Sequence, residues 1–221
     1  MRIIFITGAS GSGKSTFARK LFSKMLEQGL SVNQLSMDDY FHEVPEWVHD
    51  IEHFRRTENF DQIEKYDLHL LTMHLESLRK RKAITKPIFD FPTNKRLSSE
   101  IIEPVDYIIL EGLFALEYAK MLPDDFEKTT VFIGQSSYLE LIKTRIKRDQ
   151  SERALNEKDV LMKERKSVGP AFFSHICKSK SGVDFDITND ACDVTSDIHP
   201  LDMAVDEVLS SFICLKQTFK I

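Results

Sequence analysis

The sequence has little of what marks a secreted, membrane or nucleic-acid-binding protein. Its three cysteines, Cys177, Cys192 and Cys214, form neither a C-x-x-C pair nor the regular spacing of a disulfide or zinc framework. No apolar run approaches the roughly 20 residues of a membrane span, and the short apolar N-terminus lacks the long hydrophobic region of a signal peptide. The net charge of −5 argues against a polyanion as the main partner. We therefore expect a cytoplasmic protein with reduced thiols and with no membrane or nucleic-acid partner.

The chain also lacks the Pro-, Gly- or Ser-rich stretches that mark a linker between domains, and it contains no internal repeat. Apolar residues make up 42% of the sequence and charged residues 29%, which is ordinary for a globular protein with a substantial core. We expect a single domain over residues 1–221.

Short apolar runs rich in β-branched or aromatic residues alternate with longer segments of helical period. This alternation is typical of an α/β fold, and it predicts a doubly wound, mainly parallel five-stranded sheet with helices on both faces. One stretch breaks the pattern: residues 83–104 contain three prolines and an aromatic run, and they predict a hairpin arm that protrudes from the sheet. The expected strands are 2–7, 32–37, 107–111, 129–133 and 183–188, and the expected helices are 15–27, 61–80, 138–151, 158–166 and 203–219.

The strongest motif lies between the first expected strand and the first expected helix. Residues 8–15 match G-x-x-x-x-G-K-[ST], in which glycines let backbone N–H groups turn toward phosphate oxygens at a helix N-terminus. Lys14 is expected to reach the β- and γ-phosphates of ATP, and Ser15 to ligate Mg²⁺. The residues expected to contact the nucleotide are Gly8, Ala9, Ser10, Gly11, Ser12, Gly13, Lys14, Ser15 and Thr16.

Acidic residues follow two of the other expected strands. Glu111 ends the strand 107–111 and is a candidate partner for Mg²⁺. The next residue is Gly112, so the neighbouring acid that would position water in a hydrolase is missing, which favours transfer to an organic hydroxyl group. Asp38 and Asp39 end another strand, and Asp38, which comes directly off it, is the candidate general base. Asp39 either points outward or caps a turn.

Taken together, these segments resemble the uridine kinase family of P-loop nucleoside kinases. The first segment alone marks only a P-loop NTPase, but several segments in the family's order are far more specific. In this sequence they are GASGSGKST at 8–16, SMDDYF at 36–41, NFD at 59–61 with YD at 66–67, PIFDFPTNKR at 87–96, ILEGL at 109–113, and RIKRD at 145–149 with ER at 152–153.

The resemblance implies a P-loop NTPase fold, use of ATP and Mg²⁺, and transfer to the 5′-hydroxyl group of a nucleoside. It assigns Asp38 as the catalytic base and Asp61 as the residue that holds the sugar hydroxyl groups. A helical lid over about 143–168 would bring Arg148 and Arg153 to the transferring phosphoryl group. Many uridine kinases are homo-oligomers, so a homo-oligomer is also possible.

The sequence departs from the family where the nucleobase is read. Asn94 stands at the position of the base-reading histidine, and Phe89 and Phe41 replace two tyrosines. Asn94 offers both a donor and an acceptor to a pyrimidine edge. We expect these three residues, with Asp61 and Arg96, to surround the acceptor.

Two alternatives stay open at this stage. The first is a kinase of the same fold that acts on another small hydroxyl compound, such as a sugar phosphate or pantothenate, because the base-reading groups have changed. The second is a switch protein that hydrolyses ATP without an acceptor, against which Gly112 argues.

Overall fold

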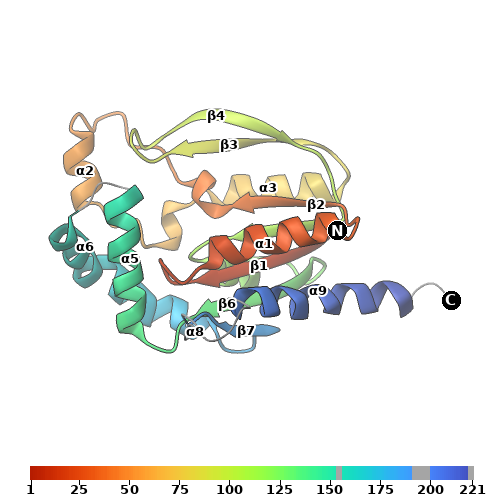
Figure 1. Ribbon diagram of the computed structural model, residues 1–221. Coiled ribbons are helices and arrows are strands. Elements are labelled where there is room, and N and C mark those ends of the chain that lie inside the picture. Colours follow the sequence, from red (N-terminus) through yellow and green to blue (C-terminus); the bar gives the residue numbers. More distant parts are fainter. Residues whose placement is uncertain (153–155, 191–199, 219–221) are drawn as a thin grey trace.

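A computed structural model describes residues 1–152, 156–190 and 200–218. Its main sheet has five parallel strands in the order β2-β5-β1-β6-β7, which confirms the predicted fold class (Figure 1). Strands β5 and β2 lie on one side of β1, and β6 and β7 lie on its other side. The loop after β1 therefore lies at the point where the strand order reverses, which is where ligands bind in such folds. The strands are β1 (Arg2–Gly8), β2 (Val32–Ser36), β5 (Tyr107–Glu111), β6 (Glu127–Gly134) and β7 (Phe185–Thr188).

Helices cover both faces of this sheet, because successive residues of a strand point to opposite sides. Ile4 and Ile6 of β1 face α1 (Lys14–Glu27) and α9 (Pro200–Thr218). Ile3 and Phe5 face α3 (Leu68–Arg79) and α4 (Ala115–Met121). A central strand buried on both faces reads as a continuous apolar run, which is why the sequence predicted β1 well.

The predicted arm is a two-stranded antiparallel sheet of its own, made of β3 (Ile84–Asp90) and β4 (Lys95–Ile102). It does not join the main sheet. It lies over α3 (Figure 1), and β3 packs on α3 and on η1, a 3₁₀ turn at Met37–Tyr40.

The lid region is more irregular than predicted. Helices α5 (Tyr138–Glu152) and α6 (Glu157–Lys163) occupy the predicted segments, and α6 continues into a π-helical turn, η3 (Glu164–Val168). In Figure 1, α5 and α6 gather with α2 (Ile51–Thr57) at one end of the molecule. The rest of the region is built from α7 (Gly169–Ala171), a π turn η4 (Phe172–Ile176) and α8 (Cys177–Ser179).

Two details of the helix prediction were wrong. The predicted helix 61–80 begins only at Leu68, because the carboxylate of Asp67 caps it by accepting from the backbone N–H of Leu70 at 3.0 Å. Residues before the cap are irregular, apart from a short 3₁₀ turn, η2 (Ile63–Lys65). The sequence also did not predict α2 and α4, which are both one to two turns long. No helix in the described ranges is long and apolar enough to cross a membrane.

Candidate phosphoryl-transfer site

The loop after β1 has the backbone shape that the phosphate-binding motif requires. Gly11 and Gly13 adopt φ values of 90° and 93°, which favour glycine. A Cβ on Gly8 would collide with the carbonyl oxygen of Ile133. Helix α1 begins at Lys14 with no side-chain cap, so its first backbone N–H groups stay available to an anion.

Two further observations show that this loop fits a phosphate group. Ser12 Oγ is buried and has no hydrogen-bond partner in the described part of the chain. Asn189, which follows β7, donates to the carbonyl oxygen of Ser12 at 2.8 Å and so holds the loop from the edge strand beyond β6. The nine predicted nucleotide-contact residues run from the last residue of β1 through this loop into the first turn of α1. Their contact with ATP stays a prediction.

Glu111 joins the phosphate loop to the end of β2. It is 7% exposed, and its two oxygens accept hydrogen bonds from Ser15 at 3.1 Å and from Ser36 at 3.0 Å. A hydroxyl beside a carboxylate supplies hard oxygen ligands that fit Mg²⁺. The described residues contain no cluster of three or more His, Cys, Asp or Glu side chains that could hold a metal ion.

The strand that ends in Glu111 has no room for a second acid. A Cβ on Gly112 would lie 2.6 Å from the Cβ of Met37, closer than such atoms pack. The carbonyl oxygen of Gly112 also accepts from Thr7 Oγ1 at 3.2 Å. The absence of a neighbouring acid is therefore built into the packing of β1, β5 and η1.

Asp38 lies in η1, directly after β2. Ser36 caps this turn, because its Oγ accepts from the backbone N–H of Asp38 at 3.3 Å. The Tyr66 hydroxyl donates to Asp38 Oδ1 at 3.5 Å. Burial, with the nearby charges of Asp38 and Asp61, raises the pKa of Tyr66 well above its usual value, so the phenol keeps its proton. The sequence did not single out Tyr66, although it stands in one of the quoted segments.

Asp39 has a different role from Asp38. It forms a buried ion pair with Lys86 of β3, and its other oxygen accepts from the backbone N–H of Phe89 at 3.3 Å. Lys86 also pairs with Glu100 of β4 at 2.8 Å. Asp39 therefore ties the hairpin to the turn that carries Asp38, and neither of the two expected roles, an outward side chain or a turn cap, describes it.

Aromatic rings line the predicted acceptor side. Phe41 stacks on Tyr66 with ring centroids 4.3 Å apart, and its centroid lies 5.5 Å from that of Phe89. Phe60 and Phe91 touch Phe41 edge-on. The structure thus brings the predicted residues Phe41 and Phe89 together.

The two polar residues expected there have structural partners. Asn94 is 3% exposed with φ of 52°, and its amide donates to the carbonyl oxygen of Phe91 in the hairpin turn at 3.2 Å. Arg96 donates to the carbonyl oxygens of Tyr40 and Phe41, both at 3.2 Å, and pairs with Asp67 at 3.3 Å. Both side chains shape the wall of the site, and direct contact with an acceptor stays a prediction for each.

The lid supplies one predicted arginine to the phosphate loop. Arg148 donates to Ser10 Oγ at 3.0 Å and to Asp149, which is 1% exposed. The Asp149 carboxylate also pairs with Arg145, which in turn pairs with Glu164 of η3. The second predicted arginine, Arg153, lies outside the described residues.

Asp61, the predicted ligand of the sugar hydroxyl groups, contacts the lid region at η3. Its carboxylate accepts from Ser167 of η3 at 2.7 Å. Sequence reasoning gave Ser167 no role, since no local pattern links residues 106 positions apart.

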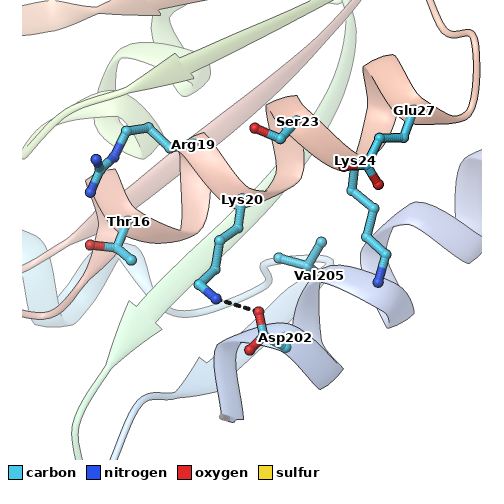
Figure 2. Close-up of a pocket in the computed structure, with 8 residues that line it drawn as sticks. All are labelled: Thr16, Arg19, Lys20, Ser23, Lys24, Glu27, Asp202 and Val205. Carbon is cyan, nitrogen blue, oxygen red and sulfur yellow. Dashed lines mark hydrogen bonds and ion pairs between the residues drawn. The ribbon is translucent and has the colours of Figure 1, made fainter. Parts of the chain in front are cut away.

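An open cleft of about 530 Å³ begins beside the phosphate loop and runs between α1 and α9 (Figure 2). Lys20 forms an ion pair with Asp202 across it. None of the predicted acceptor-side residues lines this cleft. Its lining residues are Thr16, Arg19, Lys20, Ser23, Lys24, Glu27, Asp202 and Val205.

Comparison with known proteins places these features in a family. The model of the phosphoribulokinase / uridine kinase family matches residues 3–196. A uridine kinase from Alkaliphilus metalliredigens is 33% identical over 178 residues, which are 80% of this chain and 82% of that protein.

Solved structures agree in fold. The YGR205w protein aligns with a TM-score of 0.66 at 17% identity, over 86% of this chain and 85% of that one. Phosphoribulokinase from Rhodobacter spheroides aligns with a TM-score of 0.58 at 14% identity, over 90% of this chain and 73% of that one. At these identities the likeness concerns the fold alone.

Proposed function

Because the chain belongs to the phosphoribulokinase / uridine kinase family, we propose that it transfers the γ-phosphoryl group of ATP to the 5′-hydroxyl group of a nucleoside such as uridine or cytidine. The observation that carries the proposal is the hydrogen-bonded connection from Ser15 through Glu111 and Ser36 to Asp38. This connection sets the phosphate loop and the candidate base beside each other at one edge of the sheet. A base placed there can take a proton from a hydroxyl group that attacks a loop-bound phosphate.

In this proposal the protein acts mainly by positioning and by electrostatics. The loop amides and Lys14 bind the phosphates of ATP, and Ser15 and Glu111 would hold Mg²⁺, which would supply positive charge to the phosphates during transfer. Asp38 accepts the proton of the acceptor hydroxyl group, and Arg148 stabilises the transferring phosphoryl group from its place beside Ser10.

The acceptor is held on the side of Asp38 away from the phosphate loop. Asp61 accepts hydrogen bonds from the sugar hydroxyl groups of the nucleoside, and the rings of Phe41 and Phe89 pack against the flat face of its base. Tyr66 keeps Asp38 in place through its hydroxyl group.

A second candidate acceptor is another small hydroxyl compound, such as a sugar phosphate or pantothenate. Asn94 supports it, because the amide at the base-reading position is almost completely buried in the hairpin turn. An ATP-hydrolysing switch protein is a third alternative, and the tight contact at Gly112 argues against it, since no side chain fits there to position water.

Two measurements test the proposal. Transfer of radiolabelled phosphate from ATP to uridine and cytidine, but not to pantothenate or sugar phosphates, is expected; transfer to pantothenate alone would replace the nucleoside by the second candidate. ATP consumption that does not depend on an acceptor would support the switch protein.

The Asp38→Asn variant tests the mechanism. It should lower kcat by about 10²- to 10⁴-fold, the range for loss of a general base, while the Kd of ATP stays nearly unchanged. Asp124→Asn, an exposed acid far from the site in sequence, is the control and should retain full activity. Comparable activity in Asp38→Asn would remove Asp38 from its proposed role.

A further inference from the structure

Two hydrogen bonds join the lid to the segment that carries Asp61. Ser167 Oγ donates to Asp61 Oδ2 at 2.7 Å, and Lys166 Nζ donates to the backbone carbonyl oxygen of Thr57 at 3.2 Å. The donors are consecutive residues of η3, and the acceptors lie within five residues of each other. The π-helical turn η3 is therefore docked directly on the acceptor side of the site.

The turn η3 is itself firmly anchored. Glu164, its first residue, is 9% exposed and accepts hydrogen bonds from Tyr138 and Arg145 of α5. Burial and the bond to Glu164 raise the pKa of Tyr138, so the phenol stays a donor. A side chain on an anchored element can hold a partner with little freedom of movement.

The Asp61 carboxylate is restrained by this contact on one side only. Among residues whose side chains are described, Ser167 is the single donor to the carboxylate. The backbone N–H of Asp61 is fixed separately, by the side-chain oxygen of Asn59 at 3.0 Å. A carboxylate accepts about four hydrogen bonds, so one bond from Ser167 fixes its orientation and leaves capacity for hydroxyl groups of an acceptor.

We propose that Ser167 is a positioning residue for acceptor recognition: it orients the Asp61 carboxylate so that this group can accept hydrogen bonds from the acceptor's sugar hydroxyl groups. The inference rests on the proposed role of Asp61. It also gives the lid a part in acceptor binding, in addition to the contact of Arg148 with the phosphate loop on the donor side.

The test compares Ser167→Ala with the wild-type protein. The variant should raise the KM of uridine about tenfold, the effect of one hydrogen bond to a charged group, while kcat and the KM of ATP change little. Ser167→Thr keeps the hydroxyl group and should restore most of the affinity. The ratio of kcat/KM for uridine to that for 2′-deoxyuridine or 3′-deoxyuridine should fall in Ser167→Ala, because a misoriented Asp61 forms weaker hydrogen bonds with the 2′- and 3′-hydroxyl groups.

Ser77→Ala is the matched control. Ser77 is also partly buried, and its hydroxyl group also donates to the carbonyl oxygen four residues earlier in its helix, but this hydroxyl group has no second hydrogen-bond partner in the described part of the chain. Both alanine variants should have similar thermal midpoints, and only Ser167→Ala should change the KM of the acceptor. The proposal would be overturned if the two variants had the same KM for the acceptor, or if Ser167→Ala lost thermal stability with no change in that KM.

Failure of the proposed function would give different assay results. If the wild-type protein phosphorylates a sugar phosphate or pantothenate and no nucleoside, the nucleoside proposal fails, and the same comparison is made with that acceptor. Ser167→Ala with an unchanged acceptor KM would then overturn the role of Ser167. Consumption of ATP without any acceptor would overturn both proposals.

Discussion

Tyr66 shows how burial at a single residue can set the chemistry of its neighbour. The residue is 4% exposed, its ring is stacked on Phe41, and its hydroxyl group donates to Asp38. Since burial raises the pKa of Tyr66, the phenol remains a donor at any working pH. Tyr66 therefore offers Asp38 a lasting hydrogen-bond donor, which holds the carboxylate of the proposed base in one orientation.

The Tyr66→Phe variant removes this bond and keeps the ring. We expect kcat to fall about tenfold, because Asp38 loses the donor that orients its carboxylate. The KM of ATP should not change. Steady-state kinetics measure both values, with Tyr107→Phe, at the start of β5, as the control. A kcat equal to that of the wild-type protein would show that Tyr66 does not position the proposed base.

The hairpin and the turn η1 are held together by a buried cation. The Lys86 side chain is 6% exposed and lies between Asp39 of η1 and Glu100 of β4. Removing one partner of such a pair leaves the other charge poorly solvated, which costs more than the pair contributes. The pair is therefore specific for one placement of the hairpin relative to Asp38 and Phe41.

Lys86→Met should thus destabilise the protein and loosen the acceptor side. We expect a loss of about 1–3 kcal/mol in the free energy of unfolding and a higher KM for the acceptor. The double variant Asp39→Asn/Lys86→Met should lose less than the sum of the two single variants, because no unpaired charge remains between them. Urea denaturation and steady-state kinetics measure both effects.

Lys80→Met is the matched control for this pair. Lys80 pairs with Glu76 on the surface of α3, where the two side chains are 61% and 43% exposed. An exposed pair of this kind contributes at most about 0.5 kcal/mol. Two results would contradict the role of Lys86 in holding the hairpin to η1. The first is a similar loss of stability in Lys80→Met and Lys86→Met, and the second is a double variant whose loss equals the sum of the two single losses.

Over the whole molecule, the sequence was informative wherever a local pattern was sufficient. The strands were predicted because a parallel sheet buried on both faces reads as apolar runs, and the loop 8–15 because its glycines and Lys14 stand at fixed spacing. The predicted start of α3 at residue 61 was wrong, because the helix begins only after its N-cap, Asp67, although the sequence before the cap also has apolar residues at helical spacing. Such a boundary depends on one side-chain hydrogen bond.

The proposed acceptor side was harder to predict because its contacts join distant residues. Tyr66 and Asp38 are 28 positions apart, Lys86 and Asp39 are 47 apart, and Ser167 and Asp61 are 106 apart. No periodicity or spacing carries information over such distances. The family resemblance supplied Asp38 and Asp61, but the residues that hold them in place became apparent only in the folded chain.

Binding of ATP should stabilise the whole molecule, because a ligand that binds only the folded state lowers its free energy by RT ln(1 + [L]/Kd). At about 100 times Kd this amounts to about 2.7 kcal/mol. For a chain of 221 residues, it corresponds to a rise of about 5–10 °C in Tm. Thermal unfolding with ATP and Mg²⁺ measures the shift, and chelation of Mg²⁺ with EDTA should reduce it.

The Lys14→Met variant identifies the loop as the origin of this stabilisation. It removes the cation expected at the β- and γ-phosphates, so we expect less than half of the wild-type shift. Without nucleotide its Tm should stay close to that of Lys82→Met, an exposed lysine after α3 that serves as the control. If Lys14→Met kept the full ATP-induced shift, the nucleotide would bind elsewhere, and the cleft between α1 and α9 would be the next place to test by substitution of Arg19.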